Sequence, residues 1–136
     1  AVQGGGQILN VASVAAFKPG PWMSSYHASK AYVLHFSEGL REELKKTGVK
    51  ISVLCPGPTR TEFFRNAHLE VGKLEHSKRM MSPEEVALHT VRALAKNRAV
   101  IIPGWRNKLL AFTPRLGPRW LTRKISGAIN KTYCPR

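Results

Sequence analysis

The chain has 136 residues, of which 43% are hydrophobic, and it carries 22 Lys and Arg against eight Asp and Glu. This length fits one domain, and the apolar content is enough for a buried core, which excludes intrinsic disorder over most of the chain. Two cysteines are too few for a disulfide framework and lack metal-ligand spacing. We therefore expect no metal site, and a reducing, cytoplasmic compartment.

The first predicted elements are a buried strand, a loop and a long helix. Residues 7–12 read QILNVA and predict a short strand. Residues 13–24 predict a loop, because a Pro-Gly-Pro run interrupts regular structure. Residues 25–47 predict a helix, since apolar side chains recur near the helical period and a glycine follows. Ser24 or Ser25 is its expected N-cap.

Three side chains around this loop suit acid–base chemistry. Ser13 ends the strand, and Tyr26 and Lys30 stand one turn apart on the same face of the helix. A free phenol has a pKa of about 10 and is a poor base at neutral pH, but a close ammonium favours the phenolate. Such a pair would exchange a proton with an alcohol or carbonyl held by Ser13. The alternative is an aromatic stem packed on a lysine stem.

A second informative stretch begins with residues 49–55, VKISVLC, which predict a central strand. The strand runs directly into residues 56–61, PGPTRT. In an open α/β sheet, ligands sit at the carboxyl ends of strands, so Ser13 and this turn are expected to converge on one crevice beside Tyr26. The alternative is an ordinary Pro-Gly turn followed by a threonine N-cap.

The order of these features resembles the short-chain dehydrogenase/reductase family over about residues 4–104. The resemblance implies an α/β fold, a Rossmann-like doubly wound parallel sheet of which this chain holds the C-terminal half. It also implies an oxidoreductase that transfers a hydride between NADP or NAD and a small alcohol or ketone, in a homodimer or homotetramer.

The resemblance also assigns roles to individual residues. Ser13 orients the substrate oxygen, Tyr26 is the general acid/base, and Lys30 supports Tyr26 and holds the nicotinamide ribose. Thr59, through its backbone, and Thr61, through its hydroxyl, contact the carboxamide. The cofactor-binding set is Tyr26, Lys30, Pro56, Gly57, Thr59 and Thr61.

Residues 62–82 lack a clear period, and in the family this region is a flap over the substrate. Apolar side chains there and before the helix are candidates to line the pocket, and a core contact is the alternative for Trp22. These candidates are Trp22, Phe63, Phe64, Leu69, Met80 and Met81.

The family domain is about twice as long as this chain, and its first half holds a glycine-rich turn between a strand and a helix. Residues 4–6 are glycines but precede a strand, so they are not that turn. We therefore expect the C-terminal part of a longer protein, marginal and inactive by itself because half the sheet is missing. The alternative is a non-catalytic scaffold that kept the fold.

The remaining part of the first domain, residues 1–104, contains a helix and a strand. Ser82, a proline and two acids predict a helix start at residue 83, and the helix is expected to run to about residue 96. Residues 99–102 predict a further strand.

The second predicted unit is a basic amphipathic extension, residues 105–136. From residue 86 onward the chain has eleven Lys and Arg and no acid, a net charge of +11. Pro114 and Pro118 predict two or three short helical pieces. Their apolar face is expected to pack on the enzyme or a partner subunit, and the alternative is an anionic membrane surface. Nucleic acid is less favoured, because no groove-reading module is present.

The five histidines show no metal-ligand spacing and are expected at the surface or in loops. His27 follows Tyr26 and is expected to point from a different face of the helix.

Overall fold

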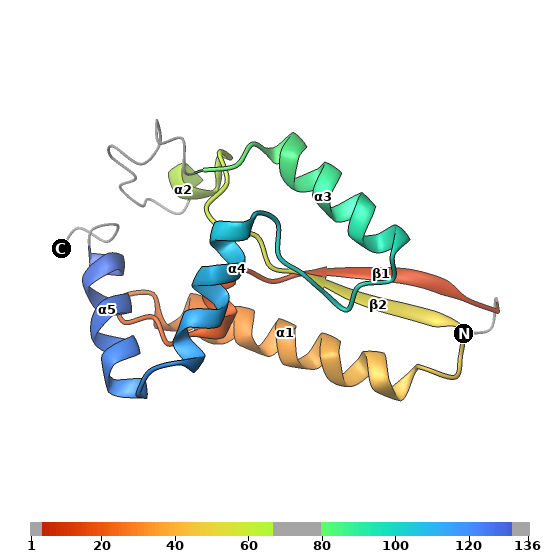
Figure 1. Cartoon of the computed structure of the whole chain (residues 1–136), viewed down its shortest axis with the longest axis horizontal. Helices are drawn as coiled ribbons and strands as arrows, with labels where there is room; N and C mark the ends of the chain where they lie inside the picture. Colours follow the sequence, from red (N-terminus) through yellow and green to blue (C-terminus); the bar gives the residue numbers. More distant parts are fainter. Residues whose placement is uncertain (1–3, 67–79, 132–136) are drawn as a thin grey trace.

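The computed structural model describes residues 4–66 and 80–131, and its framework is a parallel sheet (Figure 1). Strands β1 (Gly6–Val11), β2 (Val49–Leu54) and β3 (Val100–Ile101) follow one another in the order β1-β2-β3. The register pairs Gly6 with Val49 and Val11 with Leu54. The predicted α/β fold with a parallel sheet is confirmed.

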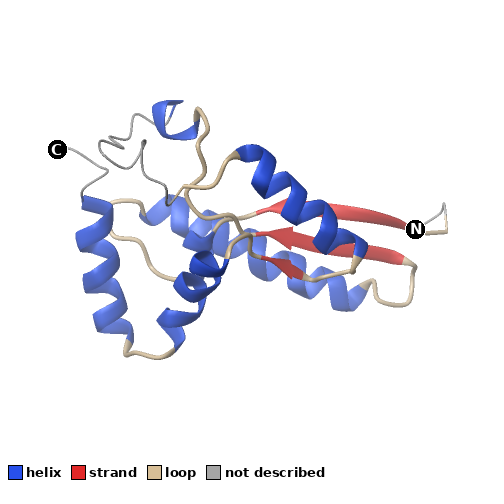
Figure 2. Cartoon of the chain, turned by 45° about the horizontal axis from the view of Figure 1, so that its top comes forward, coloured by secondary structure: helices blue, strands red, loops and turns tan. Residues whose placement is uncertain are grey.

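Helices cover both faces of this sheet, α1 (Ser24–Glu43) on one and α3 (Pro83–Ala95) on the other (Figure 2). Alternate residues of β2 explain this, because successive side chains of a strand point to opposite faces. Val53 packs in one buried cluster with Leu34 of α1, and Leu54 packs in another with Val86 of α3. A strand covered on both sides is apolar almost throughout, as β2 is.

The two crossover connections have opposite hands. Both step in the same direction across the sheet, from β1 to β2 and from β2 to β3. Since α1 and α3 lie on opposite faces, one crossover is right-handed and the other left-handed. Left-handed crossovers are rare, about 2% of cases.

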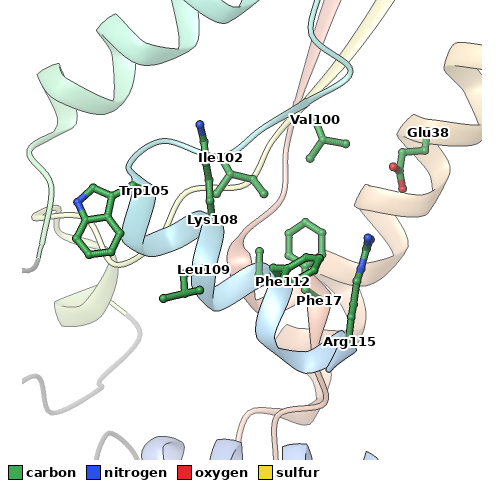
Figure 3. A pocket seen from close by; sticks show the side chains of 10 residues that line it. Phe17, Glu38, Val100, Ile102, Trp105, Lys108, Leu109, Phe112 and Arg115 are labelled. Carbon is green, nitrogen blue, oxygen red and sulfur yellow. The ribbon is translucent and has the colours of Figure 1, made fainter. Parts of the chain in front are cut away.

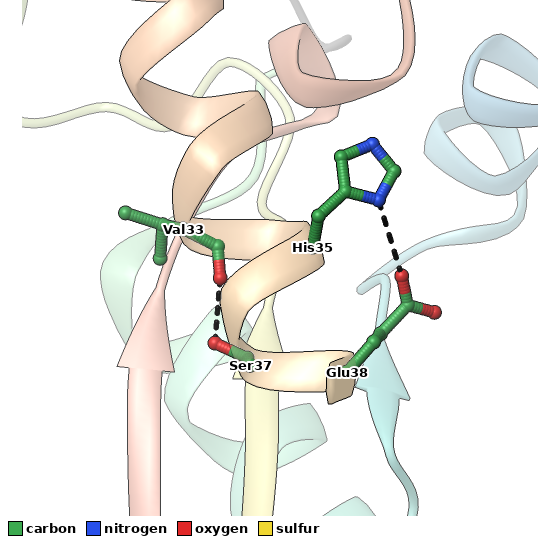
Figure 4. A network of polar contacts seen from close by, with 4 residues as sticks. All are labelled: Val33, His35, Ser37 and Glu38. Carbon is green, nitrogen blue, oxygen red and sulfur yellow. Dashed lines mark hydrogen bonds and ion pairs between the residues drawn. The ribbon is translucent and has the colours of Figure 1, made fainter. Parts of the chain in front are cut away.

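A buried serine ties α1 to the sheet. Ser37 is 2% exposed, and its hydroxyl donates to the carbonyl of Val33 at 2.6 Å (Figure 4) while accepting from Asn10 Nδ2 of β1 at 2.9 Å. The neighbouring pair of His35 and Glu38, with Nδ1 and Oε2 3.8 Å apart, is exposed and contributes little to stability.

The C-terminal extension contains short helices separated by prolines, as predicted: α4 (Trp105–Phe112), the 3-10 turn η3 (Thr113–Arg115) and α5 (Arg119–Lys131). Two further short elements, η1 (Val14–Phe17) and α2 (Phe63–Asn66), follow the ends of β1 and β2.

An apolar groove of about 650 Å³ runs beside α4 (Figure 3). Phe17, Val100 and Ile102 form its inner wall, and Leu109 and Phe112 of α4 form the outer one. The groove lies along β3 and α4 and does not include Tyr26 or Lys30, so it is separate from the predicted catalytic residues.

Several predicted boundaries need correction. Helix α1 begins at Ser24 and its N-cap is Met23, which makes no side-chain cap bond, so neither serine caps it. The helix ends at Glu43 instead of Thr47, because Leu44–Gly48 wind into turns. By contrast, the predicted start of α3 is confirmed: Ser82 Oγ accepts from the Glu85 amide at 3.2 Å and Glu85 Oε2 accepts from the Ser82 amide at 2.7 Å.

Replacing Ile51 by Ala is expected to lower the free energy of unfolding by about 2–5 kcal/mol, because this β2 side chain is fully buried and its loss leaves a cavity. Leu88→Ala, at a residue of α3 that is 51% exposed, is the control and should cost less than about 0.5 kcal/mol. Urea unfolding of both variants measures the difference, and equal losses would contradict the assigned core.

Candidate active site

Backbone hydrogen bonds bring the carboxyl ends of the three strands together. The Ala12 amide donates to the Leu54 carbonyl at 2.8 Å, the Val14 amide to Pro56 at 3.0 Å, and the Cys55 amide to Ile101 at 2.8 Å. The segments after β1, β2 and β3 therefore meet at one edge of the sheet, where open α/β sheets bind ligands.

Ser13 is held rigidly at this edge. It is 9% exposed, and its hydroxyl accepts from the Ala15 amide at 3.2 Å and lies 3.4 Å from the Pro56 carbonyl, to which it donates. The serine thereby caps η1 and joins the end of β1 to the turn after β2. Within the described residues, these contacts of Ser13 are local and do not reach Tyr26.

Tyr26 and Lys30 lie together on the first turns of α1. The Lys30 ammonium is 5.8 Å from the centroid of the Tyr26 ring, and it donates to the Val11 carbonyl at 3.2 Å. The ammonium is thus placed between the phenol ring and the last residue of β1, two positions before Ser13. The Phe63 ring packs against the Tyr26 ring, and the two ring centroids are 5.6 Å apart.

The turn after β2 is ordered by its own threonines. Thr59 Oγ1 donates to the Gly57 carbonyl at 3.0 Å, and Thr59 forms a parallel bridge with Met81. Thr61 Oγ1 lies 3.4 Å from the Phe63 amide and accepts from it at the start of α2. Thr61 therefore occupies a helix-capping position, the structural alternative for this residue, with its side chain at the surface.

The candidate pocket residues are placed differently from one another. Trp22 is 53% exposed with a positive φ of 70°, and Phe63 is 42% exposed. Met80 is 5% exposed, and Met81 packs against the buried cluster around Leu54, so both serve the core. Leu69 and the side chain of Phe64 lie outside the described residues.

The prediction that His27 is a surface residue is wrong. The ring is 6% exposed, with Nδ1 2.9 Å from the Lys18 carbonyl and Nε2 3.3 Å from Asn130 Nδ2 of α5. A neutral ring that donates from Nδ1 and accepts at Nε2 satisfies both partners. A Cβ on Gly20 would be 2.0 Å from this ring, so only glycine fits there.

Asn107 of α4 is a site residue that sequence reasoning missed. It is 7% exposed, and its Nδ2 donates to the Pro103 carbonyl at 2.7 Å. Its Oδ1 lies so close to Gly57 that a Cβ added there would be 2.1 Å away. The extension therefore supports the turn that borders the predicted cofactor position. The sequence does contain one signal for this role, because Asn107 is a polar residue among the apolar residues of its helix.

The thiol of Cys55 lies fully buried just beyond β2. Burial raises its pKa from 9.0 to about 12, and the weaker effect of a hydrogen bond from the Ser13 backbone lowers it. In the described segments 4–66 and 80–131, no three His, Cys, Asp or Glu side chains gather as a metal-ligand set.

The architecture defines a class of protein: a parallel sheet with helices on both faces and polar residues at the carboxyl ends of its strands is the doubly wound, Rossmann-like nucleotide-binding type. A family model described as short chain dehydrogenase matches residues 1–71. The chain belongs to the short-chain dehydrogenase/reductase family, whose members are oxidoreductases that use NAD(P), so the predicted family and cofactor class are confirmed.

Individual relatives agree with this assignment. Ketoacyl reductase HetN of Nostoc sp. strain PCC 7120 is 35% identical over 74% of this chain and 34% of its own length. A short-chain dehydrogenase from Sphingobium yanoikuyae in complex with NADPH has a TM-score of 0.70 and 30% identity over 85% of this chain and 42% of its own. A short-chain dehydrogenase from Burkholderia cenocepacia in complex with NADP has a TM-score of 0.68 and 29% identity. That match covers 86% of this chain and 46% of the other. The chain spans less than half the length of each.

Gly57→Ala is expected to destabilise the protein by about 1–3 kcal/mol, because the new Cβ meets the buried Asn107 amide. Asn107→Ala makes room, so the double variant should lose less than the sum of the two single losses. Gly39→Ala, in α1 with nothing within 4 Å of the added Cβ, is the control and should stabilise by about 0.5–1 kcal/mol. Thermal unfolding of the four variants measures this, and strict additivity would argue against the contact.

Cys55 is expected to resist iodoacetamide while the protein is folded and to react once urea unfolds it, because the thiolate is the reactive form. The raised pKa contributes stability that is fully present below 9.0 and lost as the pH rises toward about 12. Cys55→Ala should therefore flatten the alkaline part of the stability profile. Peptide mass spectrometry and unfolding across pH check both effects, and equal labelling of folded and unfolded protein would contradict them.

Proposed function

We propose that the protein containing this chain is an NAD(P)-dependent oxidoreductase that interconverts a small alcohol and its carbonyl compound. The contact of Lys30 with Tyr26 at the end of β1 is the observation that carries this proposal. Since the chain spans a third to a half of the relatives' length, the proposal concerns the whole protein.

Tyr26 acts as the general acid/base in this proposal. In carbonyl reduction its hydroxyl gives a proton to the substrate oxygen, and in alcohol oxidation its phenolate takes that proton. The Lys30 ammonium, 5.8 Å from the centroid of the Tyr26 ring, places a positive charge beside this group. In this proposal the Ser13 hydroxyl turns its hydrogen from the Pro56 carbonyl, 3.4 Å away in this structure, to the substrate oxygen and so orients it.

The residues of this chain fit the nicotinamide end of an NAD(P) cofactor. Lys30 would hold the ribose, Pro56 and Gly57 would border the ring, and Thr59 and Thr61 would bind the carboxamide. A Cβ on Gly57 would be 2.1 Å from Asn107 Oδ1, so a side chain at this position of the turn requires Asn107 to move. When bound, the cofactor supplies the hydride.

Gly4–Gly6 lead into the amino end of β1, away from the edge where the strands' carboxyl ends meet. This position does not suit them to cradle a pyrophosphate at that edge. We therefore assign residues 1–104 to the C-terminal half of the Rossmann-like domain and residues 105–136 to an extension of it.

Substrate and subunit contacts complete the proposal. Phe63, whose ring packs against Tyr26, and the exposed Trp22 would line an apolar substrate pocket together with Phe64. The outer face of α1 exposes stacked Tyr32 and Phe36 rings, 5.8 Å apart, which suits a helix-to-helix contact in a homodimer or homotetramer.

Tyr26→Phe, made in the protein that includes the upstream half of the domain, should lower kcat by at least about a hundredfold, because it removes the hydroxyl that exchanges the proton and keeps the ring. Tyr32→Phe, on the same helix and 68% exposed, is the matched control and should keep full turnover. Oxidation of NADPH or NADH with a panel of small ketones measures kcat. Turnover of the Tyr26 variant equal to that of the Tyr32 variant would refute the assignment.

A further inference from the structure

Helix α5 is attached to the protein by its polar side. Ser126 is 1% exposed and Asn130 is 6% exposed. Asn130 Nδ2 donates to the Pro21 carbonyl at 3.1 Å and lies 3.3 Å from His27 Nε2. Gly127 brings the helix close to the same loop, since an added Cβ there would be 3.3 Å from the Pro21 ring.

The apolar side of α5 faces outward. Trp120 is 59% exposed and Ile125 is 52% exposed, and Leu116 just before the helix is 71% exposed. An amphipathic helix on a globular protein normally turns its apolar stripe toward the core, and α5 does the opposite. Figure 1 shows it at the end of the molecule farthest from the amino ends of the strands, beyond the loop that leads into α1.

The positive charge of the C-terminal helices favours an anionic partner. Residues 105–131 carry seven Lys and Arg and no Asp or Glu. A second copy of the chain laid against α5 would bring two such segments together, and the repulsion of like charges opposes that contact. An anionic lipid surface complements both properties, since it takes the apolar stripe and attracts the cations. Exposed Trp105 and Trp120 suit the boundary between headgroups and acyl chains.

We propose that α4, η3 and α5, residues 105–131, dock the protein on an anionic phospholipid bilayer, with Ile125 and Trp120 inserted and Lys124 among the headgroups. Among the described helices, none could span a bilayer. In this proposal α5 lies in the plane of the interface, because its apolar side chains share one side of the helix. Because α5 is bonded to the loop that precedes Tyr26, docking places the candidate active site next to the lipid surface.

Co-sedimentation of the whole protein with vesicles tests this proposal independently of any enzymatic activity. The protein should bind phosphatidylcholine–phosphatidylserine vesicles and not phosphatidylcholine vesicles. Binding should fall as salt rises from about 0.1 to about 1 M, where the Debye length shortens from about 10 to about 3 Å.

Ile125→Glu should weaken binding to the anionic vesicles about tenfold or more, because it removes an inserted side chain and adds a repelled charge. Leu88→Glu is the matched control: this α3 side chain is 51% exposed, the substitution is similar, and binding should be unchanged. Circular dichroism checks that both variants fold. If Ile125→Glu fails to fold, Lys124→Gln should still weaken binding several-fold against Arg92→Gln, an exposed α3 control of equal charge change.

Absence of binding to the anionic vesicles at low salt would overturn the proposal. Equal binding of the Ile125 and Leu88 variants, or of the Lys124 and Arg92 variants, would do the same. Light scattering measures the molar mass of the unaltered protein and of Ile125→Glu. If the unaltered protein does not bind vesicles and the variant has a lower molar mass, a second copy covers α5, and the proposal is overturned.

Discussion

The arrangement depends on the hydrogen bonding of β2 along both of its edges. Ala12 donates to Leu54 on one side, and Cys55 donates to Ile101 on the other, so three segments that lie far apart in the sequence end at the same level. Parallel pairing fixes the direction of each segment as well as its position. Ser13, the turn after β2 and the start of α4 can face one another only because this central strand is paired on both sides.

The C-terminal extension is part of this arrangement and is not an appendage. Helix α4 places Asn107 behind Gly57, and α5 places Asn130 against His27 and the Pro21 carbonyl. Each contact supports a loop at the carboxyl ends of the strands, one before α1 and one after β2. The groove of about 650 Å³ beside α4 is lined mainly by apolar side chains and is separate from these loops.

The features that the sequence predicted correctly depend on residues that lie close together in the chain. The strand patterns, the Tyr26–Lys30 spacing and the Ser82 cap each involve residues within a few positions of one another, and the structure contains all three features. The burial of His27 depends on Asn130, 103 positions away, and no periodicity carries that information. The roles predicted for Thr59 and Thr61 toward a cofactor rest on the resemblance alone, since their hydroxyls here bond to Gly57 and Phe63 nearby in the chain. The Ser13 hydroxyl bonds the Ala15 amide and the Pro56 carbonyl, and its role toward the substrate stays a prediction.

The contact between Gly57 and Asn107 limits how the extension can be exchanged among relatives. A chimera joined at residue 104 would combine one protein's turn with another protein's helix, and a bulkier residue at either position would force the two apart. Recombination between family members would therefore have to carry the turn and the helix as one inherited block, even though fifty residues separate them in the gene product.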